Sequence, residues 1–260
     1  MMEKVAARSE KGTAERRAKE LFMDYGIYLI LIAMIVFFTV QKPNFLTISN
    51  ILLILRTSSV LGIACVGMFF VLIVAGIDIS VSMNMYISAV VGGIFLNQFG
   101  LPLMVCFIAS CLSGVLIGSV NGFFVTRIKI VPFIVTLATY SVARGMALFL
   151  TDQQMMFMDN KVMTLASAKF LGVSAFVFIF LGIVIIAHIV LTCTQFGRQL
   201  YACGNNLQGA NKMGINGPRT VFFAYMICGA LCGIAGMLSA CNLGVINPNF
   251  SQGDEFVVIS

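Results

Sequence analysis

The sequence predicts an all-α membrane protein, a polytopic bundle of about seven transmembrane helices. Hydrophobic residues make up 60% of the chain and charged residues only 10%, and the mean hydropathy is +1.01. These values lie well outside the usual range for soluble globular domains. A helix needs roughly 20 mostly apolar residues to cross a hydrocarbon core about 30 Å thick. Seven stretches of the chain meet that requirement.

The seven apolar stretches define the expected membrane helices, which we place in chain order at 23–40, 57–76, 79–97, 101–124, 131–150, 171–191 and 219–241. The segment before them, residues 1–22, mixes six Lys or Arg with four Glu, and we interpret it as a cytosolic tail. A signal peptide is the alternative, but no small-residue cleavage site follows the first apolar stretch. We therefore expect a tail over 1–22 and a transmembrane domain over 23–260.

The loops indicate that the N-terminus is cytoplasmic, because Lys and Arg are retained on the cytoplasmic side of a membrane. In that orientation eleven basic residues face inwards: Lys4, Arg8, Lys11, Arg16, Arg17, Lys19, Arg127, Lys129, Arg198, Lys212 and Arg219. Only Lys42, Lys161 and Lys169 face outwards. The net charge of +6 therefore reflects membrane topology and does not indicate nucleic-acid binding.

Several chemical functions are excluded by motifs that the sequence lacks. The eight cysteines form no CxxC pair and have no metal-ligand spacing, so we expect no metal site and interpret them as packing residues. No GxxxxGK[ST] loop is present, so any energy from ATP must come from another chain, and we identify no catalytic residue.

Glycines recur at four-residue spacing in two of the apolar stretches, at Gly114, Gly118 and Gly122 and again at Gly229 and Gly233. Such spacing lets helix backbones approach closely in a bilayer. The motif is compatible with packing inside one chain and with a seam between two chains.

Polar residues interrupt the apolar run "VAGIDISVSMNMY" between the second and third stretches. Asp78 is the only acid between Asp24 and Asp152, and an ionisable group near a membrane boundary is costly enough to need a reason. Asp78 and Ser80 either cap the third helix or line a polar pathway through the membrane. The two roles are compatible with each other.

A second polar region lies in "NGFFVTRIKIVPFIVTLATYSVARG". Pro132 suits the first turn of a helix, where its missing N–H is harmless. Thr136 and Thr139 follow on that helix, and Arg144 is interpreted as an end residue that reaches the membrane surface, as is Arg56 before the second helix. An uncharged, hydroxyl-rich ligand needs hydrogen-bonding groups. The candidates for such a pathway are Asp78, Ser80, Asn84, Asn121, Thr136 and Thr139.

A long basic loop, "FGRQLYACGNNLQGANKMGINGPRT", separates the last two stretches. Asn206 is a suitable cap for a short helix that carries Leu207, Ala210 and Met213 on one face. Gly214 suits the left-handed position after the helix, and Pro218 suits the first turn of the next one. We expect a helix of about eight residues, roughly 12 Å long. So short a helix needs a partner surface, and it either docks in a groove of another protein or is an ordinary solvated loop.

Three strings in this order, "GIDISV", "NGFFVTRIKIVPFIVTLATYSVARG" and "GRQLYACGNNLQGANKMGI", resemble the permease subunit of bacterial ABC importers for monosaccharides, the ribose/xylose/galactoside type. The resemblance spans about 50–250. It implies a bacterial inner-membrane permease that pairs with a second permease chain, binds cytosolic ATPase subunits and receives a monosaccharide from an extracytoplasmic binding protein. It also implies that ATP is bound only by the ATPase, so this chain needs no cofactor of its own.

By the same resemblance, residues 197–215 are the coupling segment that inserts into a cleft of the ATPase. The candidate interface residues are Gly197, Arg198, Asn205, Asn206, Leu207, Ala210, Met213 and Gly214. The sequence departs from the family pattern at Ser82, where a glycine is usual, at Val131, where a second proline is usual, and over 207–211, where Glu-Glu-Ala-Ala-Arg is usual. Family chains continue with further membrane helices, so we expect C-terminal helices to be missing.

Two other functions stay open at this point. In a proton-coupled secondary transporter, Asp78 would carry the coupling proton, although a single acid without a charged partner makes a poor relay. A truncated, non-transporting membrane protein is the third possibility. In each case the protein contacts membrane lipid and no nucleic acid.

Overall fold

A computed structural model describes residues 25–260, which are predominantly helical. The long helices are Tyr25–Gln41, α2 (Ile48–Ile73), α3 (Val81–Asn97), α4 (Leu103–Phe123), α5 (Pro132–Leu150), α7 (Ala175–Cys193) and α10 (Gly217–Leu243). The short helices are η1, a π-helical turn (Phe124–Ile128), α6 (Lys161–Ser167), α8 (Gln195–Asn205), α9 (Leu207–Lys212) and α11 (Asp254–Ile259). The strands are β1 (Met156–Phe157), β2 (Lys169–Phe170), β3 (Val173–Ser174) and β4 (Val245–Ile246).

The prediction of an all-α, multi-pass membrane protein is confirmed. Five helices in the described residues are long and apolar enough to cross a membrane, and Tyr25–Gln41 and α3 are shorter apolar helices. Each coincides with one of the seven expected stretches. The chain divides into two compact units between Leu53 and Ile54, and the bundle described below belongs to the second, Ile54–Ser260. The expected tail over 1–22 lies outside the described residues.

The start of α2 differs from the prediction, because the helix begins at Ile48 and not near residue 57. The hydroxyl of Thr47 accepts a hydrogen bond from the backbone N–H of Asn50 at 3.4 Å, which caps the first turn. Arg56 therefore lies inside α2 and not before it. Its guanidinium carbon is 5.0 Å from the ring centroid of Phe176, so a cation–π contact to α7 replaces the surface role expected for this residue.

The start of α7 also differs from the prediction. Residues near 171 were expected to open this helix, but β2 and β3 form an antiparallel hairpin there, with Lys169 opposite Ser174. Leu171 and Gly172 have positive φ angles of 50° and 81° and make its turn. The helix then begins at Ala175, where the Ser174 hydroxyl accepts a hydrogen bond from the N–H of Phe176 at 3.4 Å.

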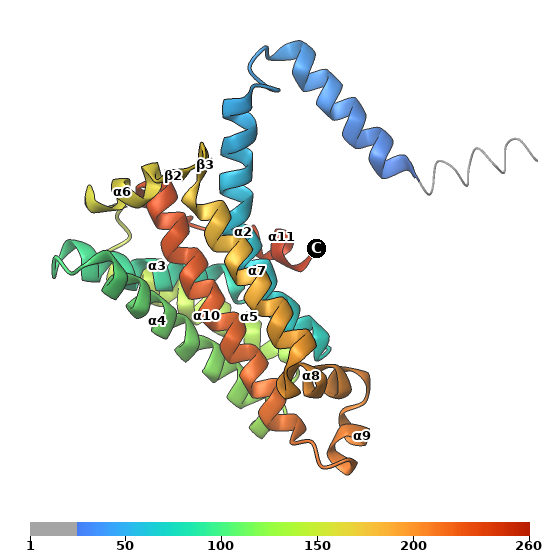
Figure 1. The fold of residues 1–260 in the computed structure, drawn as a ribbon. Helices are drawn as coiled ribbons and strands as arrows, with labels where there is room; N and C mark the ends of the chain where they lie inside the picture. The colour runs from blue at the N-terminus through green and yellow to red at the C-terminus, as the bar shows by residue number, and fades with distance from the viewer. Residues whose placement is uncertain (1–24) are drawn as a thin grey trace, which may run out of the picture. The chain divides into compact units, whose positions relative to one another are not determined.

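The core of the second unit is the contact of α10 with α4 and α3. These helices run side by side in Figure 1 and make the most extensive contacts in the bundle. A Cβ placed at Gly114 would fall on the carbonyl oxygen of Gly229, and one at Gly118 on that of Tyr225. The four-residue glycine spacing therefore serves packing inside one chain, which was one of the two expected roles.

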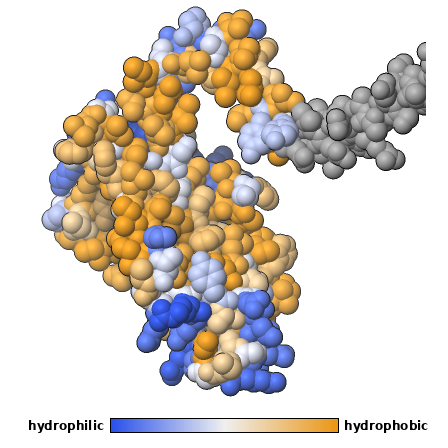
Figure 2. All heavy atoms as spheres, turned by 45° about the vertical axis from the view of Figure 1, so that its right-hand side comes forward, coloured by the Kyte–Doolittle hydropathy of each residue, from blue (hydrophilic) through white to orange (hydrophobic). Residues whose placement is uncertain are grey.

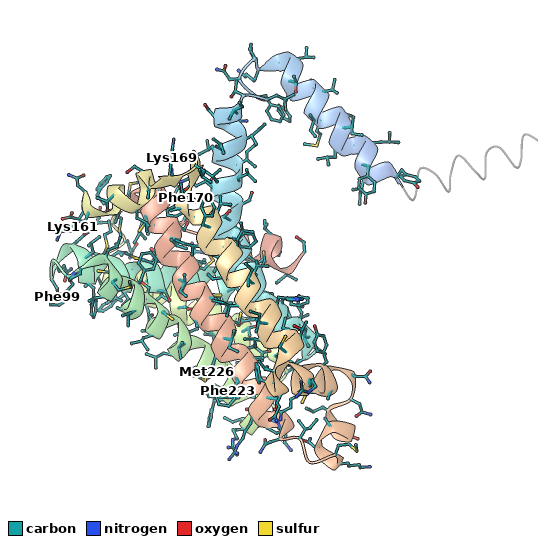
Figure 3. The ribbon with its side chains drawn as sticks, viewed as in Figure 1. Phe99, Lys161, Lys169, Phe170, Phe223 and Met226 are labelled. Atoms are coloured by element: carbon teal, nitrogen blue, oxygen red, sulfur yellow. The ribbon has the colours of Figure 1, made fainter. Side chains whose placement is uncertain are left out.

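The five basic residues assigned to the cytoplasm that lie within residues 25–260 belong to segments at one end of the bundle. Arg127 and Arg219 line the same cavity, although they are 92 positions apart in the chain, and α8 and α9 pack at this end against α10. Lys161 lies at the opposite end, as Figure 3 shows, where its ammonium group donates to the carbonyl of Gly100 at 3.2 Å. Figure 2 shows hydrophilic side chains collected at the basic end below an apolar surface. The placement of Arg127 and Arg219 at one end and of Lys161 at the other agrees with the orientation expected from the loops.

The loop at the other end is tied to the helices that frame it. Strand β1 pairs with β4, so Met156 lies opposite Ile246, just after α10. The side chain of Asn97, at the end of α3, donates to the carbonyl of Phe157 at 2.7 Å and accepts from the N–H of Asp159 at 3.0 Å. These bonds hold residues 151–174 across the ends of α3 and α10.

The close contact of α4 and α10 predicts the effect of a single added methyl group. Gly114→Ala should destabilise the protein by about 1–3 kcal/mol, because the new Cβ meets backbone that cannot move independently. Gly182→Ala, in the middle of α7, is the matched control, since nothing lies within 4 Å of its added Cβ. Unfolding of the purified protein in detergent, followed by circular dichroism, measures both. Equal stability of the two variants would contradict the packing.

Candidate functional site

A buried polar cluster lies between the segment 74–80, the start of α3 and the C-terminal end of α4. Asp78 is only 2% exposed, and Ser80 and Asn121 are fully buried. The N–H and the hydroxyl of Ser80 both donate to Oδ1 of Asp78, at 2.9 and 2.6 Å. The amide nitrogen of Asn121 donates to both carboxylate oxygens at 3.4 Å and to the Ser80 hydroxyl at 2.8 Å. Candidate residues from two separate polar regions of the sequence are thus in direct contact.

The backbone before Asp78 is shaped to bring this carboxylate inside the bundle. Helix α2 ends when Ala75 takes a positive φ of 56°, and the N–H of Gly76 bonds back to the carbonyl of Val71 at 3.0 Å. A Cβ at Gly76 would lie 2.7 Å from the hydroxyl oxygen of Tyr225, on α10. Glycine at this position therefore lets the chain pass close to α10 on its way to Asp78.

The interpretation of Asp78 and Ser80 as a helix cap is wrong. Ser80 occupies the N-cap position of α3, but its side chain makes no cap hydrogen bond. Its hydroxyl instead donates to Asp78, so the first turn of α3 is left without a side-chain cap. The Asp78 carboxylate accepts hydrogen bonds from Ser80 and Asn121, and none comes from a cationic side chain within residues 25–260. A buried carboxylate held by neutral donors is the polar centre of this site.

The polar region continues along α3. The amide of Asn84 donates to the carbonyl of Gly114 at 3.4 Å, and the hydroxyl of Ser88 donates to the Asn84 side-chain oxygen at 3.2 Å. Several buried polar atoms in the same helices have no hydrogen-bond partner in the described residues: the hydroxyls of Ser82, Ser110 and Tyr225 and the side-chain oxygen of Asn121. Unpaired buried donors and acceptors are uncommon in folded proteins and provide capacity to bind a polar ligand.

The hydroxyls of the two threonines proposed for the pathway make no hydrogen bond to this cluster within residues 25–260. Thr136 is fully buried, and its hydroxyl lies 3.4 Å from the carbonyl oxygen of Phe133 in its own helix. Thr139 donates to the carbonyl of Val135 at 3.0 Å and lines an apolar cavity of about 320 Å³ between α5, α4 and η1. Both hydroxyls are therefore used within α5, as is common for threonine in apolar helices.

The basic loop folds into two short helices. Asn206 caps α9 by accepting from the N–H of Gly209 at 2.8 Å, and Gly214 has the predicted positive φ, 84°. Pro218 lies in the first turn of α10, as predicted. Helix α9 covers six residues, two fewer than expected. Leu207 and Met213 are 44% and 84% exposed, but Ala210 is buried and is unavailable to a partner.

The sequence interpretation missed helix α8. Thr194 caps it by accepting from the N–H of Gly197 at 3.2 Å. Phe196, Leu200 and Cys203 then follow at helical spacing, a pattern that could have identified the helix. Gly197 is buried against the carbonyl of Leu191 at the end of α7, so it faces the bundle and not a partner.

Helix α8 also contacts the end of α2. A Cβ added at Gly204 would fall on the carbonyl oxygen of Ile73, the last residue of α2. The segment that carries Asp78 begins directly after this contact. The basic loop and the buried polar cluster are therefore joined through the contact of α8 with the end of α2 and through a few residues of chain.

Comparison with protein families places residues 50–260 in a family model described as "Branched-chain amino acid transport system / permease component". The D-allose transport system permease protein of Escherichia coli is 31% identical over 243 residues, which cover 92% of this chain and 74% of that protein. The ribose import permease protein of Haemophilus influenzae is 30% identical over 253 residues, 95% of this chain and 78% of that protein. The autoinducer 2 import system permease protein of Salmonella typhi is 28% identical over 233 residues, 89% and 67% of the two chains. No solved structure matches the chain.

The donors around Asp78 predict different effects for two substitutions. Asp78→Ala should lower the free energy of unfolding by about 1–3 kcal/mol, because it leaves buried donors of Ser80 and Asn121 without an acceptor. Asp78→Asn should cost less, since the Asn121 amide can turn and offer its unpaired oxygen to the new N–H. Asp159→Ala is the matched control, because Asp159 also accepts from an N–H two residues on but is exposed. Thermal unfolding in detergent distinguishes the variants, and equal losses for Asp78→Ala and Asp159→Ala would contradict the assignment.

Thiol labelling tests which side of the membrane the basic end faces. Cys203 is a poor reporter, because it is buried and burial raises the pKa of its thiol, which lowers the reactive thiolate fraction. Met213→Cys places a thiol at an exposed site, in a background in which the exposed Cys193 is replaced by Ser.

We expect an impermeant maleimide to label Met213→Cys in inverted vesicles and not in intact cells. Leu171→Cys, at the opposite end, should show the reverse pattern, since Leu171 is also highly exposed. Labelling of Met213→Cys from outside intact cells would overturn the orientation.

Proposed function

Because this chain belongs to the family of transport-system permease components, we propose that it forms the membrane pathway for a monosaccharide in an ATP-driven importer. It is a multi-pass protein of the inner membrane. The relatives named for D-allose and ribose support a sugar as the substrate. This membership does not favour a proton-coupled carrier or a non-transporting membrane protein.

The buried polar cluster is the observation that carries this proposal. A sugar presents several hydroxyl groups and no charge, so a site for it needs neutral donors and acceptors placed within an apolar wall. The hydroxyls of Ser82, Ser110 and Tyr225 and the oxygen of Asn121 offer such groups without partners of their own. They belong to α3, α4 and α10, the three helices that pack most closely. Movement of these helices against one another would change access to the cluster.

ATP hydrolysis then belongs to a separate subunit, and this chain needs no cofactor of its own. We propose that the ATPase docks on α8 and α9. Leu207 and Met213 present apolar contact area there, next to the exposed side chains of Arg198, Asn205 and Asn206. A force on α8 would reach the Asp78 segment through the contact of Gly204 with the end of α2.

A second permease chain and an extracytoplasmic binding protein complete the proposed importer. The surface for the binding protein would be the loop 151–174, at the end opposite to α8 and α9. Figure 3 shows Lys161, Lys169 and Phe170 on that end of the bundle. The hydrogen bonds of Asn97 make this loop a fixed surface and support the proposal.

The docking surface predicts the effect of a charge on the exposed face of α9. Met213→Asp should weaken association with the ATPase by about 1–3 kcal/mol, because an apolar contact is replaced by a charge that must lose its water. Leu171→Asp is the matched control, since it adds the same charge at an equally exposed apolar site on the opposite end. Co-purification of the ATPase from cells that express the whole gene cluster measures the difference. Equal retention of the ATPase by both variants would contradict the docking site.

Sugar uptake by the Asp78→Asn variant distinguishes an ATP-driven importer from a proton-coupled carrier. An ATP-driven importer should retain uptake of a labelled sugar such as ribose or allose, and a protonophore should not abolish that uptake while ATP is maintained. A carrier that moves its proton on Asp78 should lose accumulation against a gradient. Uptake of leucine in place of sugars would contradict the proposed substrate class and leave the permease assignment intact.

A further inference from the structure

A cavity of about 350 Å³ lies at the basic end of the bundle, where the end of α4 and η1 meet the start of α10. Two arginines, Arg127 and Arg219, line it together with three phenylalanines, Phe123, Phe222 and Phe223. Cationic groups and aromatic rings therefore share one wall at the boundary of two membrane-spanning helices. Neither the substrate pathway nor the proposed ATPase surface uses these residues.

Within the part of the chain that the structure describes, the two guanidinium groups have no partner. Both side chains are exposed, and within residues 25–260 neither makes an ion pair or a side-chain hydrogen bond. The cavity lining contains no acidic residue. Each guanidinium keeps five N–H donors in a planar arrangement that matches the oxygens of a phosphate group.

The charge at this cavity comes from the arginines and not from the N-terminus of α10. The first N–H groups of that helix are already bound, since Gly217 donates to the side chain of Asn211 at 3.0 Å and Arg219 donates to that of Asn216 at 3.1 Å. A ligand here would therefore be held by side chains. Removal of the arginines should remove most of the affinity for an anion.

The apolar part of the lining faces the membrane. Phe123 and Phe223 belong to the spans α4 and α10, and each is 48% exposed. Figure 3 shows Phe223 at the lower side of the bundle, close to the basic end. A ligand that fills this cavity must place an anionic group near the arginines and a hydrocarbon part against the rings.

We propose that this cavity binds an anionic phospholipid of the cytoplasmic leaflet, with Arg127 and Arg219 on its phosphate and the three phenylalanines against its acyl chains. Basic pockets between membrane helices on the cytoplasmic side recognise such headgroups. Docking of the ATPase explains the site less well, because α8 and α9 offer exposed apolar residues outside the membrane spans. Simple extension of arginines to the interface does not explain why two of them, distant in sequence, line one cavity with aromatic residues.

Native mass spectrometry of the full chain tests the lipid site. The protein is purified in mild detergent and offered equal amounts of dioleoyl phosphatidylglycerol and dioleoyl phosphatidylcholine. We expect preferential retention of phosphatidylglycerol, and we expect Arg127→Gln combined with Arg219→Gln to reduce that preference roughly tenfold or more, since each basic residue near an anionic surface contributes about fivefold. Phe223→Ser should shorten retention of both lipids, because it removes acyl-chain contact.

The matched control is Arg198→Gln combined with Lys212→Gln, which removes the same charge at the same end but outside the cavity. This control variant should still retain phosphatidylglycerol in preference to phosphatidylcholine. Equal retention of the two lipids by the unmodified protein would overturn the proposal, as would an equal loss in the control. Full displacement of phosphatidylglycerol by millimolar inorganic phosphate would show a site for a free anion. If Arg127→Gln combined with Arg219→Gln left the lipid preference unchanged but abolished co-purification of the ATPase, the cavity would be a protein interface. Either result would also overturn the proposal.

Discussion

The close backbone contact between α4 and α10 is the constraint on which the rest of the structure depends. Gly114 and Gly118 place these helices so near to one another that an added methyl group would overlap a carbonyl oxygen. In a bilayer the hydrophobic effect does not drive helices together, so close van der Waals contact has to stabilise their association. Asn121 lies within one turn of Gly118 on α4, and Tyr225 lies on the facing surface of α10. The glycine contact therefore also sets where the polar groups of the site can meet.

The polar cluster and the proposed coupling segment are joined through the contact of α8 with the end of α2. Helix α8 rests on the ends of α2 and α7 through Gly204 and Gly197, where there is no room for a side chain. Contacts of this kind transmit displacement because backbone cannot yield as a flexible side chain does. The Asp78 segment follows the end of α2 directly. A small shift of α8 would thus reach a carboxylate whose hydrogen bonds extend from the loop to α4.

The departures from the family pattern fall on structurally different kinds of position. Ser82, where a glycine is usual, adds a buried hydroxyl that has no partner among residues 25–260, so it changes the hydrogen-bonding capacity of the proposed pathway. In 207–211 the usual charged residues are replaced on an exposed helix that keeps its cap at Asn206. The proposed coupling segment thus has a capped helix whose exposed surface lacks those charges. A partner that fits this chain would need a correspondingly apolar groove.

The sequence by itself determined the fold class, the number and approximate position of the membrane helices, the cap at Asn206 and the turn at Gly214. Apolar length and local backbone preferences decide these features, and both are properties of short segments. Tertiary structure alone decided that Asp78, Ser80 and Asn121 touch, and that Ala210 and Gly197 face inwards. These facts depend on which helix faces meet, and that is set by the packing of α4 against α10 across more than a hundred residues of chain. The same reason explains why Ser80 binds Asp78 and does not cap α3. Asn121, which is 41 positions from Ser80 in the sequence, donates to the side chains of both residues.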